Sequence, residues 1–247
     1  MSTGSTQGGA MTVTPVRPHK KPRFWVLEFY QSAIGKKAVM ALTGIIIMGF
    51  VLVHMAGNLK IFTGANHLDE YGEYLRELFV PIFPHTGLLW VLRVGLIGAF
   101  VMHIHAAFGL TVMNRQSRPL GYRGGRRYKR ADYAARTMRY TGVLVGLFIV
   151  FHLFDLTWGG ANPDFVRGAP YHNLTVSLDR GWVAAIYIVA NLLLALHLYH
   201  GAWSLFQSLG WNNPRFNMWR RYFAGGFAFL VVGGNLSIVA AVILEQV

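Results

Sequence analysis

The chain has 247 residues, of which 53% are hydrophobic and only 13% are charged, and it carries a formal net charge of +13. This composition excludes a compact soluble domain and indicates an integral membrane protein. The sequence contains no cysteine. The chain by itself can therefore form neither a disulfide nor a thiolate-ligated iron–sulfur cluster.

The N-terminal 37 residues are polar at first and then basic, without an apolar run near the start. We therefore expect no cleavable signal, and we expect the first apolar segment to stay in the membrane. Residues 24–30 carry aromatic side chains beside Arg23 and Glu28. This pattern predicts either an amphipathic interfacial helix or part of a platform for a partner subunit.

Five later segments are long and apolar enough to cross a bilayer core of about 30 Å as helices. A stretch with glycine, asparagine and proline, from Gly159 to Arg180, predicts an ordered loop between the third and fourth of them. We find one domain at residues 38–247 and no internal repeat. The sequence thus predicts an all-α bundle of five transmembrane helices, at approximately residues 38–60, 86–113, 139–158, 182–207 and 222–244.

Lysine and arginine are concentrated on one side of this bundle. Six lie before the first span, nine lie from Arg115 to Arg139, and three lie before the last span. Short cytoplasmic loops collect positive charge, so we expect a cytoplasmic N-terminus and an external C-terminus in the inner (plasma) membrane. Charge confined to one face indicates topology and attraction of anionic lipid or a soluble partner, rather than nucleic-acid binding.

Six histidines fall inside the predicted spans, where a polar ring is costly and usually marks a functional site. Counted from the basic ends of the helices, one pair lies toward the outer leaflet and another toward the cytoplasm. Two imidazoles from facing helices are typical axial ligands of a haem, and imidazole also binds other metals. The sequence predicts two bis-histidine metal sites, with His54 and His152 in one layer and His103 and His200 in the other.

Other interpretations of these histidines stay open. Each imidazole could instead form a hydrogen bond with a neighbouring helix. His105 projects about 200° away from His103 around an α-helix, so only one of the two can face a given haem. His197 and His200 share a helix face, and either could be the ligand by geometry alone.

Several stretches around these histidines follow a recognisable pattern. They are residues 32–44 (SAIGKKAVMALTG), residues 54–59 (HMAGNL), His103 followed by Leu110-Thr111, Asn114-Arg115 and Arg118-Pro119, residues 136–142 (RTMRYTG) with His152, and residues 197–210 (HLYHGAWSLFQSLG). Over most of its length the chain resembles the single-chain, five-helix cytochrome b anchors of succinate dehydrogenase and fumarate reductase, the dihaem type of respiratory complex II. The last stretch is the most specific.

The resemblance implies two bis-histidine haems b, one held by His54 with His152 and one by His103 with His200. The choice of His103 over His105 rests on its spacing to the Leu-Thr and Asn-Arg pairs. It also implies electron transfer to membrane quinone from a flavoprotein that oxidises succinate, through an iron–sulfur subunit, in a complex that could itself be an oligomer. This chain would not bind succinate.

The family also contains anchors without haem. Non-haem iron, or an iron–sulfur centre completed by a partner's thiolates, therefore remains an alternative cofactor for the histidines. A cytochrome b anchor of another respiratory dehydrogenase is an alternative identity.

Quinone chemistry needs a hydrogen-bond partner for the head group, and the candidates are Ser32, Lys36, Trp203 and Ser204. The first three also have ordinary roles, as a helix cap, a positive-inside residue and an interfacial anchor. Arg93 lies within the second span and is costly there unless it is paired. A haem propionate or Asp155 could pair with it, or its side chain could extend to water.

Overall fold

The computed structural model describes residues 24–117, 130–211 and 213–247, with the side chains of residues 130–136 and of residue 216 left aside. Most of the basic N-terminal segment and of the basic loop after the second span lies outside these residues. The predicted orientation, which rests in part on those charges, stays a prediction.

Five helices are long and apolar enough to cross a membrane. They are α2 (Ala33–Asn58), α4 (Gly87–Gln116), α5 (Arg130–Leu156), α7 (Gly181–Ser208) and α8 (Asn217–Ile243). No strand occurs among the described residues. In an apolar medium a helix satisfies its backbone groups internally, which is why these apolar runs become helices. The all-α bundle of five membrane-spanning helices is thus confirmed.

Helix α2 begins five residues before the predicted start of the first span. The reason is a capping contact at Ser32, whose Oγ accepts a hydrogen bond of 2.9 Å from the backbone N–H of Gly35. The Ser32 hydroxyl in turn donates to the carbonyl of Phe29, at 2.7 Å, in the preceding helix α1 (Trp25–Gln31). The polar Lys36 and Lys37 therefore lie in the first turns of the helix rather than before it.

Three shorter helical segments lie at the end of the bundle opposite α1. A 3-10 turn, η1 (Leu59–Thr63), leads into α3 (Ala65–Glu77), and α6 (Pro170–Asp179) precedes α7. The sequence predicted an ordered loop for the whole stretch that contains α6. That prediction is incomplete, because Pro170 starts a helix whose Leu174 and Leu178, one turn apart, are buried.

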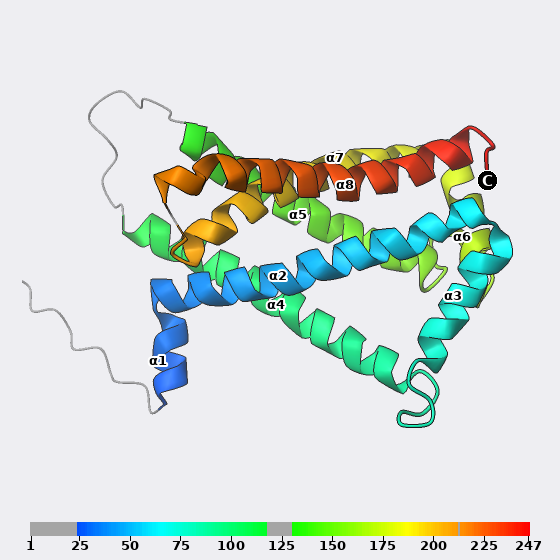
Figure 1. The fold of residues 1–247 in the computed structure, drawn as a ribbon, viewed down its shortest axis with the longest axis horizontal. Helices are drawn as coiled ribbons and strands as arrows, with labels where there is room; N and C mark the ends of the chain where they lie inside the picture. The colour runs from blue at the N-terminus through cyan, green and yellow to red at the C-terminus, as the bar shows by residue number, and fades with distance from the viewer. Residues whose placement is uncertain (1–23, 118–129, 212) are drawn as a thin grey trace, which may run out of the picture.

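The spans pack as α2 against α4, α5 against α7, and α7 against α8, while α7 and α8 also contact α2 (Figure 1). Helix α1 lies at one end of the bundle, and α3, α6 and the C-terminus lie at the other. We call these the α1 end and the α3–α6 end. A buried apolar cluster at the α3–α6 end joins α6, α7 and α8, and it includes Leu178, Val183 and Ile238.

Two asparagines connect α7 and α8 within the apolar region. The Asn235 side-chain amide donates a hydrogen bond of 3.0 Å to Oδ1 of Asn191, whose own amide donates to the Tyr187 carbonyl at 2.9 Å. Such contacts between transmembrane helices contribute roughly 0.6 to 2 kcal/mol each.

Gly35 marks the closest approach of α1 to α2 and allows a direct test of this junction. A Cβ atom at Gly35 would overlap the backbone carbonyl of Phe29, whereas a Cβ at Gly233 in α8 would meet no atom within 4 Å. We expect Gly35→Ala to lower the free energy of unfolding by about 1–3 kcal/mol. Gly233→Ala should be neutral or stabilising by up to about 1 kcal/mol, because alanine favours helix. Detergent unfolding of the two variants measures both values, and equal stabilities would contradict the contact.

Candidate functional site

The first histidine layer pairs helices α2 and α5. The ring centroids of His54 and His152 lie 5.9 Å apart with their planes at 88°. Metal–imidazole bonds of about 2.0–2.1 Å would place the centroids of two imidazoles that share one metal about 6.4 Å apart. The observed separation is about half an ångström shorter and lies in the range of an edge-to-face ring contact, so a small outward shift of the rings would admit a metal. We call this pair the His54 layer.

Aromatic side chains flank the His54 layer. Phe50 stacks on His54 with ring centroids 5.3 Å apart, and Phe148 lies 5.8 Å from His152. Nε2 of His54 makes one long contact, 3.4 Å, to the amide of Asn58 in the next turn of α2. His54 itself is exposed and His152 is half-buried, so the rings flank the pair without covering it.

A second pair of imidazoles, His103 on α4 and His197 on α7, faces threonine hydroxyls. Nδ1 of His103 lies 3.2 Å from Oγ1 of Thr43 on α2, and Nδ1 of His197 lies 3.3 Å from Oγ1 of Thr141 on α5. Each hydroxyl donates its single proton to the backbone carbonyl four residues earlier, at 2.7 and 2.9 Å. It must therefore accept from the imidazole, which leaves Nε2 of each ring as the ligand-capable nitrogen. We call His103 and His197 the His103 layer.

A local repeat underlies the two layers. Each threonine precedes a glycine, and a Cβ at Gly44 or Gly142 would lie 3.5 or 3.2 Å from Cε1 of the facing histidine. Thr43 precedes His54, and Thr141 precedes His152, by eleven residues. Eleven residues are three helical turns, or about 16 Å along the axis, so threonine and histidine share one helix face. The sequence alone predicted no internal repeat, although this Thr-Gly pair eleven residues before a histidine occurs twice in it.

His105 and His200 have different surroundings from the two layers. His105 meets the Tyr30 hydroxyl of α1 through Nδ1, so it and His103 point to different helices, as their spacing requires. Nδ1 of His200 is buried without a hydrogen-bond partner. No hydrogen bond or ring contact joins His103 to either His197 or His200 within the described residues, but His197, like His103, faces a Thr-Gly pair on another helix. The predicted pair of His103 with His200 stays a prediction, and the geometry favours the alternate, His197.

Arg93 is exposed in the half of α4 nearer the α3–α6 end, and its guanidinium lies 5.2 Å over the ring of Trp90. Asp155 does not pair with it, because that carboxylate binds Arg180 at 2.6 Å. Of the two partners that the sequence offered, only a haem propionate therefore remains as a prediction. The side chain's exposure also suits extension to water.

Two of the quinone candidates lie at the junction of α1 and α2. The Ser32 hydroxyl is committed to the helix cap described above. Nζ of Lys36 donates to the Tyr30 carbonyl at 3.1 Å and lies 4.4 Å over the Tyr30 ring. An ammonium has three protons, so Lys36 keeps donors for a further ligand.

The other two candidates lie near the end of α7. Ser204 donates to the carbonyl of Gly201 in its own helix, at 3.1 Å. Nε1 of Trp203 is buried without a hydrogen-bond partner, and the guanidinium of Arg221 lies 5.4 Å over its ring. Trp203 is therefore the one of this pair with an unused donor.

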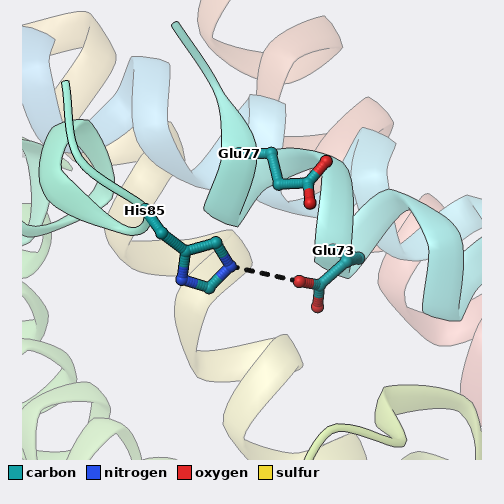
Figure 2. A group of neighbouring side chains, drawn as sticks. All are labelled: Glu73, Glu77 and His85. Atoms are coloured by element: carbon teal, nitrogen blue, oxygen red, sulfur yellow. Dashed lines mark hydrogen bonds and ion pairs between the residues drawn. The ribbon is translucent and has the colours of Figure 1, made fainter. Parts of the chain in front are cut away.

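Of the His and carboxylate groups that the structure describes, Glu73, Glu77 and His85 alone come together as three potential metal ligands, within 4.8 Å of one another (Figure 2). All three are exposed. Glu73 already pairs with Arg76 at 2.6 Å and with His85 at 3.2 Å. We interpret the group as an ion-pair cluster that connects α3 with the loop before α4.

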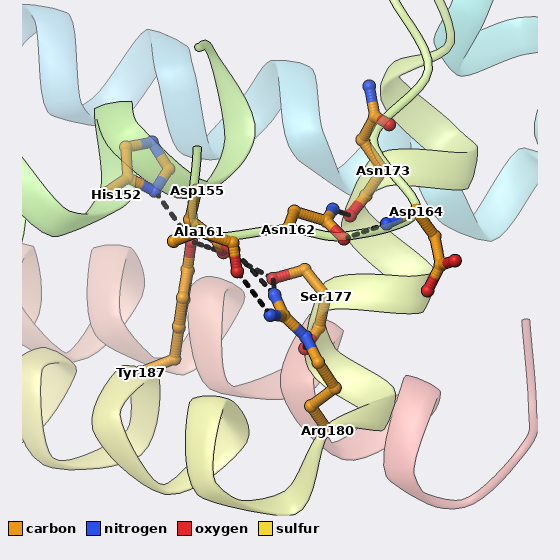
Figure 3. A network of polar contacts seen from close by, with 9 residues as sticks. All are labelled: His152, Asp155, Ala161, Asn162, Asp164, Asn173, Ser177, Arg180 and Tyr187. Carbon is orange, nitrogen blue, oxygen red and sulfur yellow. Dashed lines mark hydrogen bonds and ion pairs between the residues drawn. The ribbon is translucent and has the colours of Figure 1, made fainter. Parts of the chain in front are cut away.

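A charged network that the sequence analysis missed lies beside the His54 layer (Figure 3). His152 Nδ1 is 3.1 Å from the Tyr187 hydroxyl, which donates to the buried Asp155 at 3.2 Å. The available signal was the spacing of His152 and Asp155, three residues apart and hence on one helix face.

No protein-family model, curated protein or solved structure matches the chain. The function is therefore inferred from the arrangement of its own side chains.

The ion-pair cluster on α3 makes a pH-dependent prediction. Hydrogen bonds from Arg76 and, second, from His85 hold the pKa of the Glu73 carboxyl below its ordinary value. A lowered folded-state pKa means that these contacts favour the fold at neutral pH and are lost as the pH falls through that pKa. We expect Arg76→Gln to raise the pKa of Glu73 more than His85→Gln does. Carboxyl carbon NMR titration, with Glu73→Gln for assignment, measures it, and the reverse order would contradict the assignment.

Proposed function

We propose that the chain is the membrane anchor and electron-transfer subunit of a succinate:quinone oxidoreductase. In this role it accepts electrons from an iron–sulfur subunit, fed by a flavoprotein that oxidises succinate, and passes them to membrane quinone. The observation that carries the proposal is the His54–His152 pair across α2 and α5, together with Thr43 and Thr141, about three turns away along these two helices, which face His103 of α4 and His197 of α7. This chain makes no contact with succinate itself.

We infer that these residues would hold two haems b. His54 with His152 would hold one, and we infer that His103 with His197, rather than His200, would hold the other. Bound haem supplies one-electron chemistry that side chains alone cannot provide across an apolar core. The chain's own contribution is orientation: Thr43 accepts from Nδ1 of His103, Thr141 accepts from Nδ1 of His197, and both Nε2 atoms stay free.

The soluble subunits would dock at the α1 end, on the cytoplasmic side of the inner (plasma) membrane. Helix α1 exposes a set of large apolar side chains, among them Trp25 with 78% of its surface accessible, and buries none of its residues. The predicted orientation places the basic loops at this same end, where they would attract an acidic partner surface or anionic lipid.

Quinone would bind near that end, close to the entering electrons. Lys36 and Trp203 are the candidates that keep unused donors, whereas the hydroxyls of Ser32 and Ser204 have partners within the helices. A positioned donor can stabilise the reduced oxygen of the head group or supply its proton.

Haem content tests the ligand assignment. We expect about two haems b per chain in the purified complex, by pyridine haemochrome assay, as two bis-histidine layers require. Replacing His54, His152, His103 or His197 with alanine should lower the count to about one, or prevent assembly. His105→Ala is the matched control on α4 and should keep two haems, and His200→Ala should do so as well.

A loss of haem in His200→Ala with two haems kept in His197→Ala would restore the pairing of His103 with His200. Absence of haem from the wild-type complex would contradict the proposal. Iron and sulfide analysis would then test the alternative, an iron–sulfur centre ligated in part by these histidines.

Lys36 can be tested against its neighbour in the chain. Lys36 is half-buried beside Tyr30, whereas Lys37 is exposed in the same turn of α2. We expect Lys36→Met to lower quinone reduction by the assembled complex roughly tenfold or more, as loss of a positioned donor does. Lys37→Met should retain activity. Both are measured as succinate-dependent quinone reduction at equal haem content, and equal rates for the two variants would exclude Lys36 from the quinone site.

A further inference from the structure

An ion pair with a buried carboxylate lies two hydrogen bonds away from His152 of the His54 layer (Figure 3). Asp155 on α5 has no accessible surface, and its Oδ1 pairs with the guanidinium of Arg180 at 2.6 Å. Its Oδ2 accepts hydrogen bonds from the hydroxyls of Ser177 and Tyr187. A buried carboxylate is stable only when it is compensated in this way.

The Tyr187 hydroxyl links this carboxylate to His152. A phenol has one proton, and a carboxylate paired with a guanidinium is an acceptor. Tyr187 therefore donates to Asp155, at 3.2 Å, and accepts from Nδ1–H of His152, at 3.1 Å. These two hydrogen bonds favour the tautomer with the proton on Nδ1. Nε2 of His152 is then the ligand-capable nitrogen.

The two layers differ in where these bonds end. In the His103 layer, the imidazoles donate to threonine hydroxyls that pass their protons to backbone carbonyls. In the His54 layer, the bond from His152 leads through Tyr187 to the carboxylate of the Asp155–Arg180 ion pair. A hydrogen bond toward an anion raises the basicity of the opposite imidazole nitrogen, and a nearby negative charge favours the more positive, oxidised state of a metal centre.

We propose that Tyr187 and Asp155 are positioning residues for His152, which fix its tautomer and direct its hydrogen bond toward the carboxylate end of the Asp155–Arg180 ion pair. The hydrogen bond toward this carboxylate lowers the reduction potential of the centre in the His54 layer and leaves the centre in the His103 layer nearly unaffected. The inference rests on the proposed haem ligation by His54 and His152.

Redox titration of the whole complex tests the inference. The variants are Tyr187→Phe, which breaks the chain of bonds but keeps the ion pair, and Asp155→Asn, which removes the carboxylate charge and leaves the Arg180 cation without its ion-pair partner. Both should shift the midpoint potential of one haem upward and change its low-spin electron paramagnetic resonance signal, while the other haem keeps both properties. His152→Ala, which should remove the haem of the His54 layer, identifies the signal.

Thr141→Val is the matched control, because it removes the hydroxyl partner of His197 in the other layer. It should alter the potential or signal of the haem that Tyr187→Phe leaves unchanged. If Asp155→Asn does not assemble, Tyr187→Phe alone decides, since Arg180 and Ser177 still compensate the carboxylate there.

Two haems with unchanged potentials and signals in Tyr187→Phe, or equal shifts of both haems, would overturn this inference and leave the proposed function standing. A wild-type complex without haem would overturn the proposed function, and this inference with it.

Discussion

The cost of an unpaired polar group in an apolar medium is the constraint on which this structure depends. It makes the backbone helical in all five spans, because helices satisfy their own amides. The same cost governs the side chains. Thr43 and Thr141 accept hydrogen bonds from imidazoles, and Asn235 donates a hydrogen bond to Asn191. The Asp155 carboxylate accepts hydrogen bonds from Ser177, Arg180 and Tyr187. Polar groups without a partner, such as Nδ1 of His200, therefore stand out.

Helices α2 and α5 take part in both histidine layers, whose electrostatic surroundings differ. Helices α2 and α5 each contribute a Thr-Gly pair to one layer and, three turns later, a histidine to the other. Neutral hydroxyls face the His103 layer, whereas the Tyr187–Asp155 chain reaches the His54 layer. If both layers hold the same cofactor, these surroundings would give its two copies different potentials.

The two ends of the bundle differ in how the chain covers them. At the α3–α6 end, α6 packs on the spans and buries Leu174 and Leu178. At the α1 end, α1 exposes its apolar side chains, and Lys36 and Trp203 keep unused donors. Exposed apolar side chains and unused donors at the α1 end suit contact with lipid, quinone or another subunit. This agrees with the proposed place of electron entry.

The sequence by itself determined the five spans, because a run of about 20 apolar residues has no other stable form in a bilayer. It also singled out the six membrane histidines, since any polar ring there needs a reason. It did not determine α3 and α6, whose stability comes from packing against distant helices. Nor did it determine partners: whether His197 or His200 faces His103, and whether Asp155 binds Arg93 or Arg180, depends on helix rotation and contact. Those are set only when the side chains of all five helices pack together.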